Sequence, residues 1–198
     1  MYEIAAKKGS VDAMARYGAF LCDQENYETG LSWLEKAVNQ NNALACTYLG
    51  NCYFEGRYFK EDKLKAFKLY NKANELGDLM GKFYLALFHV NENLKGCSPS
   101  KGVEILEGLQ NFCSQRQDSY DKTINAKFYG KNYYKISEIS SLLGEKENIP
   151  FQIILKSKEH SGENKINLFE DISLILGHCY HYGIGIKKEL FKSGVLFR

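Results

Sequence analysis

The chain has 198 residues, enough for one large or two small domains with a buried core. Its net charge of +2, with no cluster of five or more Lys and Arg, argues against nucleic acid or an anionic membrane as partner. No stretch is apolar and long enough to cross a bilayer, and residues 1–11 lack the pattern of a secretory signal. We therefore expect a cytoplasmic protein whose six cysteines are reduced thiols packed as small apolar residues.

A short phrase closes the predicted helices at regular intervals. It begins with Ala and ends four residues later with Gly or Asn, at residues 5–9, 37–41 and 73–77. Gly and Asn tolerate the left-handed backbone conformation in which many helices end. Self-similarity at a nearly fixed step is typical of repeat proteins, in which each unit packs on its neighbours.

The best-defined unit is predicted to be two helices joined by a turn. Apolar and aromatic residues recur with helical spacing over residues 43–55, and Gly56 ends this first helix. The second helix begins with Asp62 as its N-cap and stops at Gly77. A glycine inside a helix costs about 1 kcal/mol relative to alanine, so the recurrence of Gly50 as Gly18 and Gly177 indicates a close contact between paired helices.

The second helices keep a step of 36 residues, whereas the first helices do not. The predicted N-caps lie 36 residues apart, at Asn26, Asp62 and Ser98. Gly18 and Gly50 are only 32 residues apart. We therefore expect the turn inside the first repeat, between Gly18 and Asn26, to be four residues shorter.

A further repeat is predicted near the C-terminus. Residues 49–70 align with residues 176–197 without a gap. The segment Leu49-Gly50-Asn51-Cys52-Tyr53 falls on Leu176-Gly177-His178-Cys179-Tyr180, and Asp62, Lys65 and Leu69 fall on Glu189, Lys192 and Leu196. Matches spread over the whole segment indicate the same helix pair in both places.

The middle of the chain, residues 114–170, is predicted to hold a divergent helical repeat or an insertion. The segment Ala126–Tyr133 has the composition of a first helix. Pro150 opens a predicted helix that runs to Lys158 and stops near Gly162. Longer loops are expected at Cys113–Tyr120 and Ser161–Lys165.

These residues resemble the Sel-1-like repeat (SLR), a helix-turn-helix relative of the tetratricopeptide repeat. Its pattern has Leu-Gly in the first helix, a Gly-x-Gly turn, then Asp and Lys-Ala, and Ala-Ala-x-x-Gly at the close. Tyr182–Ile186 matches the turn, and Leu64–Ala66 matches the opening of the second helix. Residues 56–58 lack the second turn glycine, and Ala86 replaces the glycine of Leu-Gly.

The resemblance implies an all-α fold, a right-handed solenoid of antiparallel helix pairs. We predict Sel-1-like repeats over residues 1–113, a divergent repeat or insertion over residues 114–170, and a further repeat, truncated at its end, over residues 171–198. Because the chain starts inside the tail of a second helix and stops before a closing Ala, we expect a fragment of a longer array.

By resemblance, the function is a non-catalytic protein-interaction scaffold or adaptor, in signalling or complex assembly, with no cofactor. A protein or peptide partner would bind the concave face built by the first helices, without insertion into a membrane. No binding residue is assigned, but natural lining positions are Arg16, Asn51, Lys82 and His178.

Two alternatives come from the same family. In some members the repeats are appended to a protein kinase, so the chain could be the regulatory tail of a larger enzyme. Some secreted members carry a disulfide in each unit, but here Ala37 and Ala73 stand near the second-helix ends where the paired cysteines would be needed.

A third alternative, a metal protein or hydrolase, depends on His178, Cys179 and His181. The two imidazoles are three residues apart on one helical face, but a closed zinc site needs four ligands. Cys179 also aligns with Cys52, which no histidine follows, so we predict a core cysteine beside two half-exposed histidines, with no metal site and no catalytic residue. The nearby Gly183-x-Gly185 follows a helix and lacks a third glycine, so it is predicted to be a turn rather than a dinucleotide site.

Overall fold

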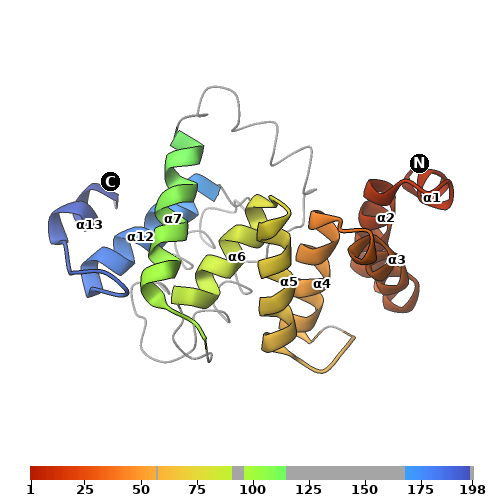
Figure 1. The fold of residues 1–198 in the computed structure, drawn as a ribbon, viewed down its shortest axis with the longest axis horizontal. Helices are drawn as coiled ribbons and strands as arrows, with labels where there is room; N and C mark the ends of the chain where they lie inside the picture. Colours follow the sequence, from red (N-terminus) through yellow and green to blue (C-terminus); the bar gives the residue numbers. More distant parts are fainter. Residues whose placement is uncertain (57, 91–95, 115–167, 197–198) are drawn as a thin grey trace. The chain divides into compact units, whose positions relative to one another are not determined.

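The computed structural model describes residues 1–56, 58–90, 96–114 and 168–196. All regular secondary structure in these ranges is helical, which confirms the predicted all-α class. The helices are α1 (Tyr2–Lys7), α2 (Val11–Asp23), α3 (Tyr27–Asn39), α4 (Ala43–Glu55), α5 (Lys63–Glu75), α6 (Leu79–Val90), α7 (Pro99–Ser114), α12 (Leu168–Tyr182) and α13 (Leu190–Leu196) (Figure 1). They fall into two compact units, Met1–Leu85 and Ala86–Arg198.

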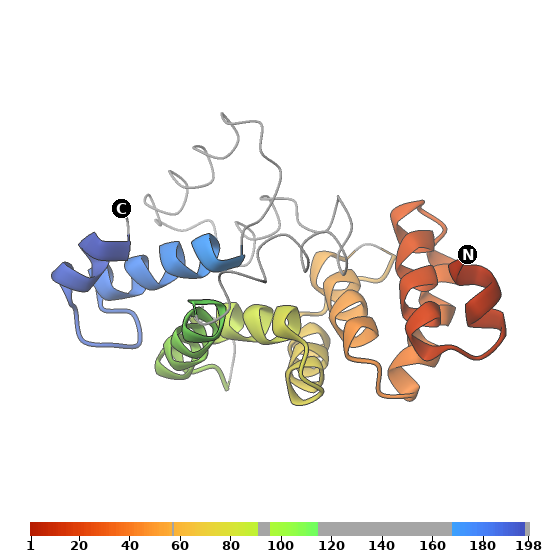
Figure 2. The ribbon, with the colours of Figure 1, turned by 90° about the horizontal axis from the view of Figure 1, so that it is seen from above.

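In the first unit the helices pair as consecutive antiparallel hairpins, α2 with α3 and α4 with α5 (Figure 1, Figure 2). Helix α4 has the predicted bounds, and Gly56 closes it in the left-handed conformation with φ of 65°. Asp62 caps α5, and its carboxylate accepts a hydrogen bond from the backbone N–H of Lys65 at 2.9 Å. The turn between α2 and α3 spans residues 24–26, and the turn between α4 and α5 spans residues 56–62. The predicted shortening by four residues is therefore confirmed.

The recurrent phrase that begins with Ala forms a turn that ends one helix and starts the next. Its last residue has a positive φ of 94° at Gly9, 57° at Asn41 and 86° at Gly77. The following residue donates its backbone N–H to the carbonyl of the Ala that opens the phrase; these pairs are Ser10–Ala5, Asn42–Ala37 and Asp78–Ala73, at 3.0, 3.0 and 2.9 Å. This is the Schellman pattern of helix ends.

The residue that donates its backbone N–H in that bond also caps the next helix with its side chain. Its side-chain oxygen accepts a hydrogen bond from the backbone N–H three residues later, in the pairs Ser10–Ala13, Asn42–Ala45 and Asp78–Gly81. Asp78 also accepts a hydrogen bond of 2.7 Å from the buried hydroxyl of Thr47 on α4. We call residues 5–10, 37–42 and 73–78 the shared turns, because each satisfies orphan backbone groups of two helices.

Small residues set the distance between the two helices of a hairpin. A Cβ added at Gly18 would lie 2.8 Å from the carbonyl oxygen of Gly30 on α3. A Cβ added at Gly50 would lie 2.7 Å from the ring of Tyr70 on α5, which is fully buried. Both contacts confirm the close approach predicted for these two glycines.

The facing positions in the second helices also repeat. Gly30, Ala66 and Gly102 lie 36 residues apart, and the C-terminal alignment places the buried Ser193 at the same position. A Cβ added at Gly102 would lie 2.9 Å from the carbonyl oxygen of Ala86, which stands where earlier first helices have glycine. The close contact is thus kept in this hairpin by a glycine on the opposite helix.

Other expectations have mixed outcomes. Asn26 occupies the predicted N-cap position of α3, but its side chain makes no capping hydrogen bond. Helix α7 begins after Ser98 as predicted, but it continues through Cys113 to Ser114, so the loop predicted to start at Cys113 is wrong at that end. The helices predicted at residues 126–133 and 150–162 and the loop at residues 161–165 lie outside the described residues. The division into three segments stays a prediction.

We expect Gly18→Ala to lower the free energy of unfolding by about 1–3 kcal/mol, because the added methyl group has no room against the Gly30 carbonyl. Gly108→Ala is the matched control, since an added Cβ on this exposed helical glycine has no neighbour within 4 Å. That control should gain up to about 1 kcal/mol from helix propensity. Urea denaturation followed by circular dichroism measures both, and an equal loss in the two variants would contradict the packing argument.

Candidate functional site

One stripe of side chains on α2 and α4 reaches solvent along one side of each helix. Outside it, Val11, Tyr17, Ala43 and Tyr53 are half-buried, and the remaining residues of the two helices are buried. Its members are Asp12, Arg16, Phe20 and Asp23 on α2 and Leu44, Tyr48, Asn51 and Glu55 on α4. Spacings of three and four residues place each set on one side of its helix. Helix α2 also packs against α4. We call these residues the first-helix stripe.

Three pairs of stripe residues occupy equivalent repeat positions, and two of these pairs differ in chemistry, whereas Phe20 and Asn51 align with the buried Cys52 and Ala19. The 32-residue step places Asp12 on Leu44, Arg16 on Tyr48 and Asp23 on Glu55. The most open apolar member is Phe20, which is 54% exposed. The aromatic residues and the arginine of the stripe belong to the residue types that are enriched at protein–protein interfaces.

Hydrogen bonds hold part of the stripe in place. The Asp12 carboxylate accepts a hydrogen bond of 2.7 Å from the side-chain amide of Asn42, the N-cap of α4. Asn51 accepts one of 2.6 Å from the hydroxyl of Tyr70, whose ring lies against Gly50. The stripe is therefore tied to the same residues that set the helix spacing.

The residues of α6 that correspond to the stripe do not reach solvent. Met80 and Tyr84, which lie 36 residues after Leu44 and Tyr48, are both buried. Of residues 80–90, only Lys82 is half-buried and the rest are buried. Among the described residues, the solvent-reaching positions of the first helices in the first unit are thus concentrated on α2 and α4.

The four lining positions suggested by the sequence are not equivalent in the structure. Arg16 and Asn51 belong to the stripe, and Lys82 is half-buried on α6. His178 is only 4% exposed, so it cannot line an open surface. Sequence reasoning missed Phe20, although it lies four residues after Arg16 on the same face of α2.

Cys179 is buried and His181 is half-buried, as predicted, but His178 is buried, so the prediction that both histidines are half-exposed is wrong for His178. Burial, with a smaller contribution from His181, lowers the pKa of His178, and burial raises the pKa of Cys179 to about 12. A thiol with that pKa is protonated near neutral pH, which is unsuited to a nucleophile. His178 packs against the ring of Tyr182 at 4.6 Å between centroids, and His181 lies 3.5 Å from the hydroxyl of Ser193.

The predicted turn at Gly183-x-Gly185 is confirmed as a turn. Both glycines have positive φ, 73° and 67°, between the end of α12 and the start of α13. The backbone N–H of Gly183 donates to the carbonyl of Cys179 at 2.8 Å, which closes α12.

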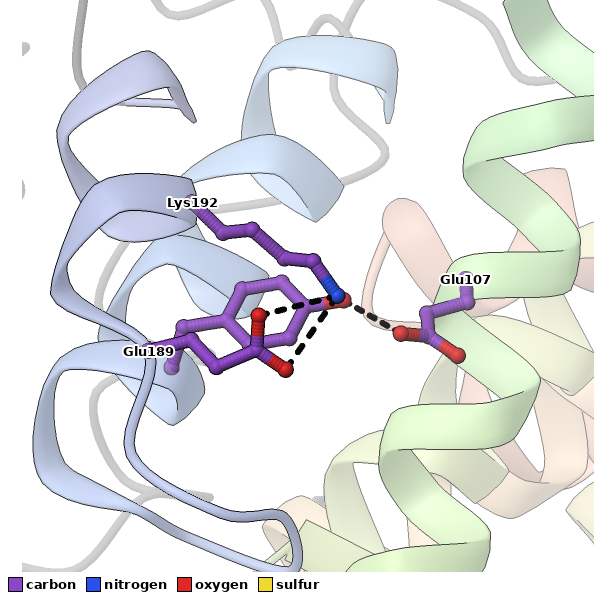
Figure 3. A network of polar contacts seen from close by, with 4 residues as sticks. Glu107, Glu189 and Lys192 are labelled. Atoms are coloured by element: carbon purple, nitrogen blue, oxygen red, sulfur yellow. Dashed lines mark hydrogen bonds and ion pairs between the residues drawn. The ribbon is translucent and has the colours of Figure 1, made fainter.

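Four residues form a polar network in the second unit (Figure 3). Lys192 lies 3.1 Å from a carboxylate oxygen of Glu189 and 5.2 Å from the ring centroid of Tyr180. The Tyr180 hydroxyl donates a hydrogen bond to Glu107 on α7, and burial and then Glu107 raise the pKa of this tyrosine. The arrangement fits a structural tether between α12 and α7.

The C-terminal network repeats part of the second hairpin. There Lys65 lies 3.8 Å from a carboxylate oxygen of Asp62 and 4.9 Å from the ring centroid of Tyr53. The backbone N–H of Asp62 donates to the carbonyl of Tyr53 at 2.8 Å, and Glu189 donates in the same way to Tyr180 at 2.9 Å. The gapless alignment therefore corresponds to the same geometry in three dimensions.

The described residues contain no group of three or more His, Cys, Asp or Glu placed to hold a metal ion. In the same part of the chain, no helix combines the length and apolar character needed to span a membrane. The cysteines all lie in described ranges and form no disulfide with one another; all are buried except the half-buried Cys97. The recurrent small residues and caps, by contrast, have clear packing roles.

The Sel1 repeat family model matches the chain at residues 11–42, 43–78 and 174–193. The first two matches are the hairpins α2–α3 and α4–α5, and the third lies in α12–α13. The predicted resemblance is confirmed in these places, while residues 79–113, which it also included, lie outside the matches.

Solved structures of Sel1 repeat proteins are similar to this chain. A protective antigen from uropathogenic Escherichia coli with an SLR fold is 19% identical, with a TM-score of 0.51 over 99% of this chain and 46% of its own. A putative sel1 repeat protein from Klebsiella pneumoniae is 16% identical, with a TM-score of 0.53 over 98% of this chain and 88% of its own. A Sel1 repeat protein from Oxalobacter formigenes is 20% identical, with a TM-score of 0.50 over 99% of this chain and 72% of its own.

These similarities establish the fold, a helical solenoid of the SLR type. The chain spans about half the length of the Escherichia coli protein. No curated protein matches the sequence.

The buried histidine predicts a pH dependence. Because the pKa of folded His178 lies below its ordinary value of 6.5, protonation favours the unfolded chain. Its effect on stability is constant above pH 6.5 and becomes destabilising as the pH falls below it, by at most about 1.4 kcal/mol per pH unit.

We expect His178→Gln to reduce the fall in unfolding free energy between pH 7 and pH 5, whatever its effect on stability at pH 7. His89→Gln is a useful comparison, because burial also lowers the pKa of His89. Urea denaturation at several pH values gives the slopes. Identical slopes for the wild type and His178→Gln would rule out a contribution from His178.

Proposed function

We propose that this chain, which carries Sel1 repeats at three places, is a non-catalytic protein-interaction scaffold that binds its partner through the first-helix stripe. The observation that carries the proposal is the contrast between two classes of repeat position. Positions that pack the hairpins keep small residues and caps, whereas the stripe residues reach solvent and the equivalent pairs Asp12–Leu44 and Arg16–Tyr48 change chemistry between repeats. Arrays of this kind bind partners through an extended surface to which neighbouring repeats contribute.

The partner class follows from the stripe's chemistry. Phe20 offers an exposed aromatic ring beside Arg16 on α2, and Tyr48 continues the aromatic character on α4. A helix or extended segment with an apolar anchor and flanking polar groups suits such a surface. We place this binding on the face of the first helices, the face expected to be concave in the family.

We further propose the role of an adaptor in signalling or complex assembly, in a reducing compartment such as the cytoplasm. The compartment is supported by the thiols, which are kept without disulfides and are mostly buried as core residues. The adaptor role rests on the family resemblance. It is also supported by the repeated positions, whose small residues and caps are explained by helix packing and need no catalytic role.

The test compares two exposed apolar residues on different kinds of helix. Phe20 on α2 is 54% exposed, and Leu64 on α5 is 56% exposed, so serine at either position should leave the fold intact. We expect Phe20→Ser to reduce partner recovery about tenfold or more, as for an aromatic anchor, while Leu64→Ser leaves recovery unchanged.

The measurement is affinity purification of the tagged full chain, followed by quantitative mass spectrometry of the proteins recovered with each variant. Circular dichroism melting curves establish that both variants are folded. Equal recovery of every bound protein by the wild type and Phe20→Ser would reject the stripe as the binding surface.

A further inference from the structure

The repeat register is interrupted at Cys113. The positive-φ residues of the shared turns are Gly9, Asn41 and Gly77, and the 36-residue step from Asn41 to Gly77, taken once more, reaches Cys113. Cysteine lacks the glycine-like tolerance of positive φ, and α7 runs on to Ser114 instead of turning. The next described helix, α12, starts only at Leu168.

Helix α7 and the C-terminal hairpin nevertheless meet as consecutive repeats do. In the first unit, the turn of the second hairpin covers the start of α3, where the rings of Tyr58 and Tyr27 stack at 6.2 Å. Gly185 aligns with Tyr58, and Pro99 lies two 36-residue steps after Tyr27. A Cβ added at Gly185 would overlap the backbone carbonyl group of Pro99, so the equivalent positions meet again at this junction.

Two side-chain hydrogen bonds fasten the same junction further along α7. The hydroxyl of Tyr180 donates to the Glu107 carboxylate (Figure 3). The amide of Gln110 donates to the hydroxyl of Ser173, which is buried, at 3.0 Å. Together with the Gly185 contact, these bonds extend from the start of α7 to its last turns.

We propose that residues 115–167 are an insertion between two directly stacked repeats. The surface of α7 that carries Pro99, Glu107 and Gln110 is a docking surface for a Sel1-type hairpin, and its partner is the hairpin α12–α13 of the same chain. The recognition features are a glycine at the second turn position, for close approach, and a tyrosine at the end of the first helix, for the bond to Glu107.

The alternative is a complete degenerate repeat stacked between α7 and α12. Ser98 and Glu189, the starts of two second helices, are 91 residues apart, where neighbouring repeats are 36 apart. The residues beyond one 36-residue step are enough to form one more repeat between α7 and α12. An intervening repeat would, however, separate Gly185 from Pro99. Direct contact at three points along α7 favours the insertion.

The test cuts the folded full-length chain on both sides of the proposed insertion. Protease sites are placed after residue 116 and before residue 166, and the intact protein is digested under native conditions. We expect the C-terminal fragment to stay bound to the N-terminal fragment in native mass spectrometry and size-exclusion chromatography. Separation of the two fragments, or departure of the hairpin with the excised segment, would overturn the proposal.

Paired glycine variants show whether the retained complex uses this junction. Gly185→Ala and Gly183→Ala impose similar backbone strain, since both glycines have positive φ, but the nearest atoms to an added Cβ at Gly183 are at 3.4 Å and belong to its own hairpin. We expect Gly185→Ala to weaken the cut complex about tenfold more than Gly183→Ala, as for overpacking at an interface. Equal effects of the two variants would show that the fragments associate by another surface.

The hydrogen bond to Glu107 provides a second readout. Tyr180→Phe and Glu107→Gln should each weaken the cut complex, and their effects should not add, because both remove the same bond. Glu104→Gln, on the exposed side of α7, is the matched control and should leave binding unchanged. Additive effects of the two junction variants would contradict the assigned contact.

Discussion

The close approach of paired helices is the constraint on which the other features of each hairpin depend. At Gly18 and at Gly50 the backbone lies within reach of the opposing helix, and no side chain larger than hydrogen fits without movement. Such proximity requires a glycine at each of these two contacts. The residues of the first-helix stripe, which reach solvent, are free of this requirement.

This separation connects the packing to the proposed function. Asn51 belongs to the stripe and also receives the hydroxyl hydrogen bond of Tyr70, whose ring packs on Gly50. Asp12 is likewise fixed by Asn42. A partner would thus meet side chains already held by the framework, which lowers the conformational entropy lost on binding.

Much of the fold could be predicted because its signals are local. The step of the phrase that begins with Ala, the cap at Asp62 and the shortened first turn all depend on residues close together in the chain, and each was found where expected. The burial of His178 could not be predicted in this way, because it depends on neighbours distant in sequence. The same holds for the contact between Gly185 and Pro99.

The site was harder to predict than the fold for a physical reason. Packing positions repeat, so comparison of the chain with itself reveals them, but a binding surface need not repeat. Phe20 aligns with Cys52, which is buried, and thus has no counterpart that would have indicated an exposed aromatic residue. Only the solvent exposure in the folded unit distinguishes it.

The shared turns have a consequence for how the array loses its structure. Since one residue such as Asn42 satisfies the end of α3 and the beginning of α4, fraying of either helix removes a stabilising bond from the other. Neighbouring hairpins are thereby coupled, and opening at one joint propagates instead of remaining local. At Cys113 helix α7 continues instead of forming a shared turn, so the coupling of α7 with α12–α13 rests on the close approach of Gly185 to Pro99 and on the hydrogen bonds of Glu107 and Gln110.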